Sequence, residues 1–416
     1  MSSLPDPTST RNSAIGGRLL ATLALLSALG PLAIDAYLPG FTAMAEDLDT
    51  PPSTVQLTLT AFLFGLALGQ LVIGTLSDRF GRRRPLLIAL SISTLAGIGC
   101  ALAPAVELLI PLRFVQGFTG AAGVVISRAI VRDLSEGRAT VRAFSLLGAI
   151  GSFAPVVAPL LGGALMPLVD WRGVLGAVAV ISGGMVLTAW LAVPESLPVE
   201  RRAGGGIGAT LAIAGGLFQN RLFVRYLLTN AFTFGALFSY ISASPFMLQN
   251  VFGLSSGAYS LAFAFKAAGL IVGSAANARI VHRVEPAKIL LAAQVTMAAV
   301  TLLLALTILT GVATIASVLP MTFLFVGTIG FTIGNASALA LTSVSVAIGT
   351  AAAILGATQF AFGAVASPLV GLGGEETAVP MAIVMVACTT LALMMLMTTR
   401  RAAMIPAPSA LPAEMK

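Results

Sequence analysis

Long apolar stretches recur along the whole sequence, and they limit what the chain can fold into. A helix needs about 20 apolar residues to cross the hydrocarbon core of a bilayer. Twelve stretches are long enough: 18–40, 54–76, 85–104, 107–130, 142–166, 173–193, 224–246, 257–280, 287–310, 313–336, 347–371 and 378–398. With 57% hydrophobic and 9% charged residues, the composition lies far from that of a soluble domain. We therefore predict an all-α membrane protein with twelve transmembrane helices.

The basic residues indicate how these helices cross the bilayer. Of the 23 Lys and Arg residues, all except Arg113, Arg172 and Lys266 lie at the termini or near the loops after spans 2, 4, 6 and 8. Positively charged loops of membrane proteins face the cytosol. We therefore expect both termini to be cytosolic. The same distribution accounts for the net charge of +7 without a nucleic-acid-binding face.

Residues 194–222 form the longest connection between apolar stretches, and their Pro and Gly content is typical of a linker. They would separate an N-terminal six-helix bundle, residues 1–193, from a C-terminal six-helix bundle, residues 223–416. A weak repeat supports this division, because Gly273 follows span 8 as Gly74 follows span 2. Repeated halves of this kind are typical of transporters whose site lies between the halves near mid-membrane.

The densest charge between two apolar stretches lies in residues 74–86, after span 2. Here an aspartate can pair with a neighbouring arginine, and glycines permit a tight turn and a close helix contact. We expect this loop to hold the helices on its two sides together, as a cytosolic latch. Its candidate residues are Gly74, Asp78, Arg79, Gly81 and Arg82.

Asp35 is one of three residues that stand out among the ionisable residues of the apolar stretches, where a charge costs about 2.5–3.5 kcal/mol on insertion scales. A carboxyl group removed from water holds its proton more tightly than one in water. Such a group suits a carrier that must bind and release protons. The alternative is that Pro39 ends the first helix and leaves Asp35 hydrated at the membrane rim.

Arg113 and Lys266 carry the opposite charge inside spans 4 and 8. A guanidinium near Asp35 would favour the ionised carboxylate, so a change in their separation could load or release the proton. Alternatively, Arg113 extends to the membrane surface, and Lys266 either lines a cavity or does the same. If both face the cavity, neutral or anionic substrates are favoured over cations.

Spans 5 and 7 suggest a moving helix contact and a drug site. Small residues and prolines about four residues apart lie near one helical face, against which another helix can bend and slide. In span 5 they are Gly148, Gly151, Pro155, Pro159, Gly162 and Gly163. In span 7, polar and aromatic groups that suit an amphipathic drug are Asn230, Phe234, Phe238 and Tyr240. Chance in a Gly-rich chain and ordinary helix packing are the respective alternatives.

Cys100 and Cys388 lie in different apolar stretches, and the single histidine, His282, lies in a basic loop. This pattern offers neither a disulfide framework nor metal-ligand spacing. A membrane-embedded enzyme would need a cluster of His, Cys or acidic residues. We therefore expect no enzyme activity, no metal and no cofactor, with a proton gradient as the energy source.

These motifs resemble the major facilitator superfamily over essentially the whole chain. Residues 74–86 are similar to its loop signature after span 2. Residues 112–117 are similar to its proton-linked motif in span 4, and residues 148–163 to its antiporter motif in span 5. Signatures of the bicyclomycin and chloramphenicol resistance (Bcr/CflA) drug-efflux family are similar to residues 35–39, 131–133 and 170–172. Two residues depart from the pattern: Ala154 stands where a Gly is usual, and Lys266 stands where we expect a neutral residue.

The resemblance implies two six-helix bundles that rock about a central site, with proton-coupling roles for Asp35 and Arg113. It also implies that Asp78 and Arg82 form a latch that stabilises the outward-open state. The candidate substrate-binding residues are Tyr37, Gln116, Asn230, Phe234, Phe238, Tyr240 and Lys266.

The leading prediction is a proton-coupled antiporter that exports chloramphenicol- or bicyclomycin-like drugs. It would act as a monomer in a prokaryotic inner membrane, with drugs, protons and the lipid bilayer as partners and no nucleic acid. The alternative is a proton-coupled symporter, or an exporter of a small metabolite, with the same fold. The Gly and Pro pattern of span 5 argues against symport.

Overall fold

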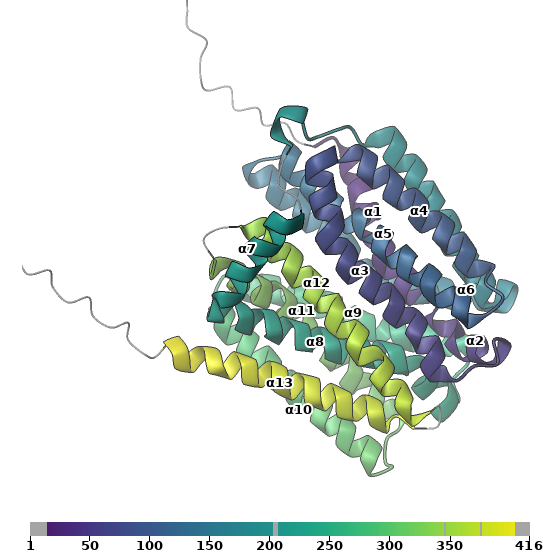
Figure 1. Cartoon of the computed structure of the whole chain (residues 1–416). Coiled ribbons are helices and arrows are strands. Elements are labelled where there is room, and N and C mark those ends of the chain that lie inside the picture. The colour runs from purple at the N-terminus through teal and green to yellow at the C-terminus, as the bar shows by residue number, and fades with distance from the viewer. Residues whose placement is uncertain (1–14, 203–206, 345–346, 375–376, 404–416) are drawn as a thin grey trace, which may run out of the picture.

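The computed structural model describes residues 15–202, 207–344, 347–374 and 377–403. Every regular element within these ranges is a helix, as Figure 1 shows. Eleven helical segments of the described chain are long and apolar enough to cross a membrane. The predicted all-α membrane fold is therefore confirmed.

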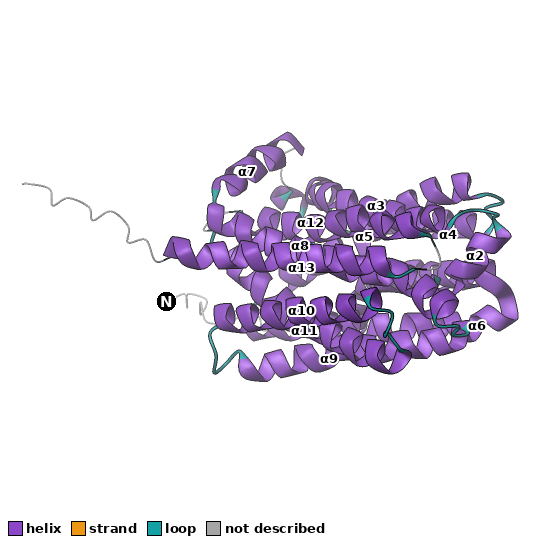
Figure 2. Ribbon diagram, turned by 90° about the horizontal axis from the view of Figure 1, so that it is seen from below, coloured by secondary structure: helices purple, strands orange, loops and turns teal. Residues whose placement is uncertain are grey.

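The helices fall into two sets along the chain. The first half contains α1 (Gly17–Asp35), η1 (Leu38–Gly40), α2 (Phe41–Asp47), α3 (Pro52–Phe80), α4 (Arg83–Ala101), α5 (Val106–Leu134) and α6 (Gly137–Ala192). After η2 (Val199–Arg201) and α7 (Ile207–Gln219), the second half contains α8 (Arg221–Phe246), η3 (Met247–Val251), α9 (Ser256–Ile280), α10 (Pro286–Leu309), α11 (Ile315–Thr342), α12 (Ile348–Leu369), η4 (Val370–Gly373) and α13 (Val379–Ala403). Figure 2 shows α7 and the last turns of α13 at one end of the bundle, called the near end, and α2 at the other, called the far end.

The helical segment α6 accounts for the difference between eleven segments and twelve predicted spans. Its 56 residues would extend about 84 Å at about 1.5 Å per residue, far more than the roughly 30 Å of a bilayer core. The helix breaks at Asp170, whose φ of 54° and ψ of −171° are not helical. The Asp170 carboxylate accepts the N–H groups of Arg172 at 2.6 Å and Gly173 at 3.2 Å, and so caps the second arm. The two arms match the predicted spans 142–166 and 173–193.

The first span extends beyond its predicted end at residue 40. The α-helix α1 ends at Asp35, but η1 and α2 continue the helical path to Asp47, which gives one apolar segment of 31 residues. Pro39 lies in the first turn of η1, where a missing N–H costs no hydrogen bond. Asp35 consequently lies inside the segment and not at its end.

The predicted linker, residues 194–222, contains η2 and α7, while residues 203–206 within it lie outside the described part. Asn220 caps the helix that follows, because its side-chain oxygen accepts the first free N–H groups of α8 at 3.0 and 3.1 Å. The Asn220 amide also donates to the Ser343 carbonyl at 2.7 Å. This contact ties the start of α8 to the end of α11. The boundaries of the two bundles stay a prediction.

A close helix contact recurs in the two halves. A Cβ built on Gly69 of α3 would lie 2.1 Å from the Phe118 carbonyl oxygen of α5. A Cβ built on Gly273 of α9 would lie 2.0 Å from the Gly327 carbonyl oxygen of α11. Only glycine lets backbones approach this closely. By its packing position, Gly273 therefore corresponds to Gly69. The sequence repeat instead aligned Gly273 with Gly74, so the expected alignment of the two halves differs from the one that the helix contacts give.

The two halves are hydrogen-bonded to each other at the far end. The helix α3 lies against α12, and α6 lies against α9. Side-chain hydrogen bonds between the halves, within the described residues, run from Thr42 to Asn250 at 3.1 Å, from Gln249 to the Pro39 carbonyl at 3.3 Å and from Gln56 to the Ser242 carbonyl at 3.3 Å. All of these residues lie in or beside η1, α2, η3 and the far-end turns of α3 and α8. The far end is therefore closed in this conformation.

Candidate functional site

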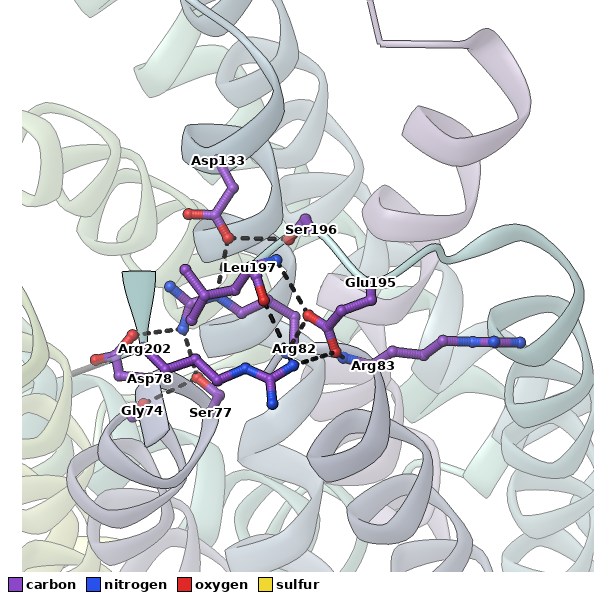
Figure 3. A network of polar contacts seen from close by, with 10 residues as sticks. All are labelled: Gly74, Ser77, Asp78, Arg82, Arg83, Asp133, Glu195, Ser196, Leu197 and Arg202. Atoms are coloured by element: carbon purple, nitrogen blue, oxygen red, sulfur yellow. Dashed lines mark hydrogen bonds and ion pairs between the residues drawn. The ribbon is translucent and has the colours of Figure 1, made fainter. Parts of the chain in front are cut away.

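Arg82 is the centre of a polar network at the near end, which Figure 3 shows. The side chain lies between the end of α3 and the start of α4 and is buried. One terminal nitrogen donates to the Asp78 carboxylate at 2.5 Å and to the Ser77 hydroxyl at 2.8 Å, and Nε donates to Asp133 at 2.9 Å. The planar guanidinium can serve several acceptors at once, which a lysine ammonium does with less geometric precision. The network therefore joins the α3–α4 loop to the end of α5.

Glu195, which follows α6, holds the same loop from the other side (Figure 3). Its carboxylate accepts the backbone N–H groups of Arg82 at 2.7 Å, Arg83 at 3.3 Å and Leu197 at 3.1 Å. Partial burial alone would raise the pKa of Glu195, but these three donors and the nearby Arg202 guanidinium hold that pKa below its ordinary value. A carboxylate at this place also suits the N-terminus of α4.

Gly81 makes the contact with Glu195 possible. Its φ is 90°, and a Cβ built on it would lie 2.5 Å from a Glu195 carboxylate oxygen. Of the two other predicted latch residues, Gly74 joins the network through its backbone carbonyl, which accepts the Ser77 hydroxyl at 2.8 Å, whereas Arg79 lies outside it. A Cβ on Gly74 would meet only Val125, at an ordinary 3.5 Å, and the Arg79 guanidinium lies over the Phe80 ring at 5.3 Å.

The network includes residues that the sequence reasoning did not place there. Asp133 stands in one of the family-like signatures, but nothing in its spacing indicated contact with Arg82. Glu195 and Ser196 were assigned to the linker, although the Ser196 hydroxyl donates to Asp133 at 2.9 Å. The sequence feature that could have indicated this contact is an acidic residue directly after span 6, on the same side of the membrane as the basic loop. Every contact described for this network lies within residues 74–202, so it braces the first half of the molecule.

Asp35 is buried at the last turn of α1, with 3% of its surface exposed. Its Oδ1 atom has no hydrogen-bond donor among the described residues. The cation that interacts with it electrostatically is Lys266 of α9, from the other half. The side chain is thus removed from water, contrary to the alternative of a hydrated carboxylate at the membrane rim.

Arg113 of α5 does not contact Asp35 in this conformation. The side chain is fully buried and donates to the Gln116 side-chain oxygen at 2.7 Å and to the Ala33 carbonyl at 3.0 Å. Its guanidinium lies 4.2 Å from the Tyr37 ring centroid and 4.4 Å from that of Phe62. The expected pairing of Arg113 with Asp35 is therefore absent here, and so is the alternative in which Arg113 extends to the membrane surface.

Lys266 is also buried, with 2% of its surface exposed, and does not reach the membrane surface. Its ammonium lies 3.4 Å from the Phe263 ring centroid and 4.5 Å from the Tyr240 ring centroid. Cations are attracted to aromatic faces at such distances. Lys266, Tyr240 and Phe263 therefore form one cluster, whose ammonium interacts electrostatically with Asp35.

The remaining candidate substrate-binding residues lie apart from this cluster. The Tyr37 hydroxyl is 3.2 Å from the Thr58 hydroxyl, and Gln116 is held by Arg113. On α8, the Phe234 and Phe238 rings pack against Phe360 of α12, with centroids 6.2 and 6.0 Å from it. Asn230, one turn closer to the near end, is fully buried, and neither of its amide atoms has a hydrogen-bond partner among the described residues. An unpartnered buried amide is costly and can be satisfied by a ligand.

The glycines of α6 differ in how closely they are packed. In the part of α6 towards the near end, a Cβ on Gly148 or Gly151 would meet nothing within 4 Å. Towards the far end, a Cβ on Gly162 would lie 1.8 Å from the Ala36 carbonyl oxygen, and one on Gly163 would lie 2.1 Å from the Ser260 hydroxyl. The far part of the pattern is therefore packed between α1 and α9. Pro155 and Pro159 lie in the helix between these two parts.

Metal chemistry has no evident site in the described part of the chain. No group of three or more His, Cys, Asp or Glu residues that could hold a metal ion is found there. Cys100 is buried, Cys388 is partly buried, and both are free.

Comparisons with known proteins agree with this architecture. A family profile of the Major Facilitator Superfamily matches residues 23–371. An uncharacterized MFS-type transporter of Bacillus subtilis, YdgK, is 39% identical over 87% of this chain and 90% of its own length. A bicyclomycin resistance protein homolog of Haemophilus influenzae is 30% identical over 90% of this chain and 94% of its own length.

A likeness to a solved structure supports the fold. The crystal structure of a bacterial homolog of the human lysosomal transporter Spinster, inward-facing and unoccupied, superposes with a TM-score of 0.71 at 17% identity, over 94% of this chain and 98% of the other. The motifs, the helices and the matched relatives agree with one another. The chain belongs to the major facilitator superfamily, among relatives named for drug resistance, and is a multi-pass membrane transporter and not an enzyme.

Proposed function

We propose that this protein exports small-molecule drugs in exchange for protons. The observation that carries the proposal is the burial of Asp35 inside a membrane-spanning segment, where it interacts electrostatically with a cation of the other half. An isolated carboxylate is costly within the bilayer, and binding a proton removes that cost. A carboxyl group between two moving halves is therefore a natural proton carrier. The relative named for bicyclomycin resistance supports drugs as the exported class.

In the proposed mechanism, the two halves rock about the region that contains Asp35 and Lys266. The hydrogen bonds at the far end would break when the halves open there, and drug and proton would bind from opposite sides in turn. Because basic loops face the cytosol, we place the near end in the cytosol of a bacterium and the chain in the inner membrane, as a monomer. Arg113 then contributes by fixing the position of α1 through the Ala33 carbonyl. The substrate would contact residues on both halves: Tyr37, Gln116, Asn230, Phe234, Phe238, Tyr240 and Lys266.

The network around Arg82 has a structural part in this proposal. It joins α3, α4, α5 and the segment after α6, so that these elements move as one unit. Without it, the tilt of one helix would not be passed to the others. We propose that this is how Asp78 and Arg82 affect transport.

Proton release from proteoliposomes tests the proposal. Addition of an uncharged drug such as chloramphenicol to vesicles that contain the wild-type protein should drive protons off the carrier, and Asp35→Asn should lose this signal. Glu107→Gln is a suitable control, because Glu107 is an exposed acidic residue at the start of α5. Undiminished proton release in Asp35→Asn would remove Asp35 from the mechanism. Uptake of substrate together with protons would instead establish symport.

A further inference from the structure

The cluster around Lys266 has the composition of a binding site for an organic cation. Aromatic rings that face a positive group, with an acid nearby, are how proteins recognise quaternary ammonium ions. Here Phe263 and Tyr240 supply the rings, and Asp35 supplies the acid. The positive group is the protein's own ammonium.

Charges buried inside the spans are few. Asp35 is the one buried acidic residue in the described part of the chain. The buried basic residues are Lys266, Arg113 and Arg82, and Arg82 is paired with Asp78 and Asp133 at the near end. Arg113 is held by a carbonyl and an amide, neither of which carries a charge. Within the described spans, the buried basic residues Lys266 and Arg113 therefore outnumber the one buried acid, even when Asp35 is ionised.

We infer that Lys266 is a specificity-determining residue that fills the cation site from within and so restricts export to uncharged or anionic drugs. The inference rests on the proposed function, because it takes the space between the halves as the drug pathway. A cationic drug would have to enter beside a like charge and compete with Lys266 for the same rings and the same carboxylate. An uncharged or anionic drug meets no such competition.

The charge of Lys266, and not its bulk, carries this role. Methionine at this position keeps an unbranched apolar stem of similar size but removes the ammonium. It would leave the rings of Phe263 and Tyr240 and the Asp35 carboxylate free for a cation from solution. Arginine keeps the charge and its attraction to aromatic faces. The two substitutions should therefore have opposite effects on selectivity.

Binding of tetraphenylphosphonium, a permanent lipophilic cation, tests the inference on the purified full-length protein by titration calorimetry. Lys266→Met should bind this cation at least about tenfold more tightly than the wild type, as expected for a gained cation–π contact away from water. Lys266→Arg should bind it as weakly as the wild type. The gain should disappear in the Asp35→Asn/Lys266→Met double variant. Lys288→Met is the matched control, because Lys288 is an exposed lysine at the start of α10.

Equal affinity of the cation for the wild type and Lys266→Met, or an equal gain in Lys266→Arg, would overturn the inference. If Lys266→Met is not monodisperse, Lys266→Gln replaces it. Competition in the wild type gives an independent measurement, because displacement of bound chloramphenicol by tetraphenylphosphonium would also overturn the inference. None of these binding measurements needs a proton gradient. A failure of proton-coupled export would therefore appear in the proteoliposome assay and not here.

Discussion

Replacement of Glu195 should weaken the near-end network by an amount that the structure allows us to assign. Glu195→Ala removes the acceptor of three backbone N–H groups, those of Arg82, Arg83 and Leu197. Arg82 is buried, and its N–H makes the shortest of these bonds, at 2.7 Å, so water is least able to replace this one. The Glu195 side chain is 33% exposed, and water can serve the other two donors.

The expected cost is therefore that of one buried donor left without a partner, about 2 kcal/mol in the free energy of unfolding, or roughly thirtyfold in the unfolding equilibrium. Glu195→Gln keeps an acceptor oxygen but loses the charge, and should cost about half as much. Unfolding by dodecyl sulfate in mixed micelles measures both. Glu200→Gln, an exposed residue of η2, is the control.

The pH dependence gives a second measurement of the same contact. Because the pKa of Glu195 is lower in the folded protein than its ordinary value, the carboxylate stabilises the folded state at neutral pH. This contribution is lost as the pH falls from about 4.3, the ordinary value for Glu, through the lower folded pKa. The difference between the wild type and Glu195→Gln should therefore shrink over this range. A cost in Glu195→Ala no larger than in the Glu200→Gln control, or a difference that grows on acidification, would refute the reasoning.

Three further substitutions have defined outcomes. Gly81→Ala should lower the free energy of unfolding by about 1–3 kcal/mol, because φ is 90° there and the new methyl group meets Glu195; the same micelle assay measures it, and a neutral result would contradict the geometry. Gly273→Val should reduce the yield of monodisperse protein on size exclusion, since α9 and α11 cannot stay in contact, whereas Gly148→Val, at a site with open space, should not. Asp78→Asn should impair drug export in vesicles but leave membrane insertion intact, since it removes one of the acidic partners of Arg82; full activity would show that the latch does not support transport.

The number, length and order of the membrane helices could be predicted because they depend on local composition. About 20 apolar residues must cross the bilayer as a helix whatever their neighbours are. The break at Asp170 follows from the same rule, since no single helix of 56 residues fits within one span. The first span ran past its predicted end because Pro39 lies in the first turn of η1 and does not interrupt the helical path.

The partners of the buried charges could not be predicted, because they depend on which helices face one another. The sequence singled out Asp35, Arg113 and Lys266 by their cost in lipid, and proposed Arg113 as the partner of Asp35. In the folded chain Arg113 donates to Gln116 and to the Ala33 carbonyl, while the cation that interacts electrostatically with Asp35 is Lys266 of the second half. Contacts between α9 and η1, the short helix that follows α1, cross more than 200 residues of chain, and no periodicity within either element reports them.

The contacts of the near-end network were likewise predictable from the sequence only in part. Asp78 and Arg82 lie four residues apart at one loop, and this closeness along the chain makes their pairing readable in the sequence. Asp133 and Glu195 reach the same arginine from the ends of other helices, so only the packed bundle brings them there. Local composition thus decided where the chain enters and leaves the membrane. The packing of distant helices decided which buried charge lies beside which.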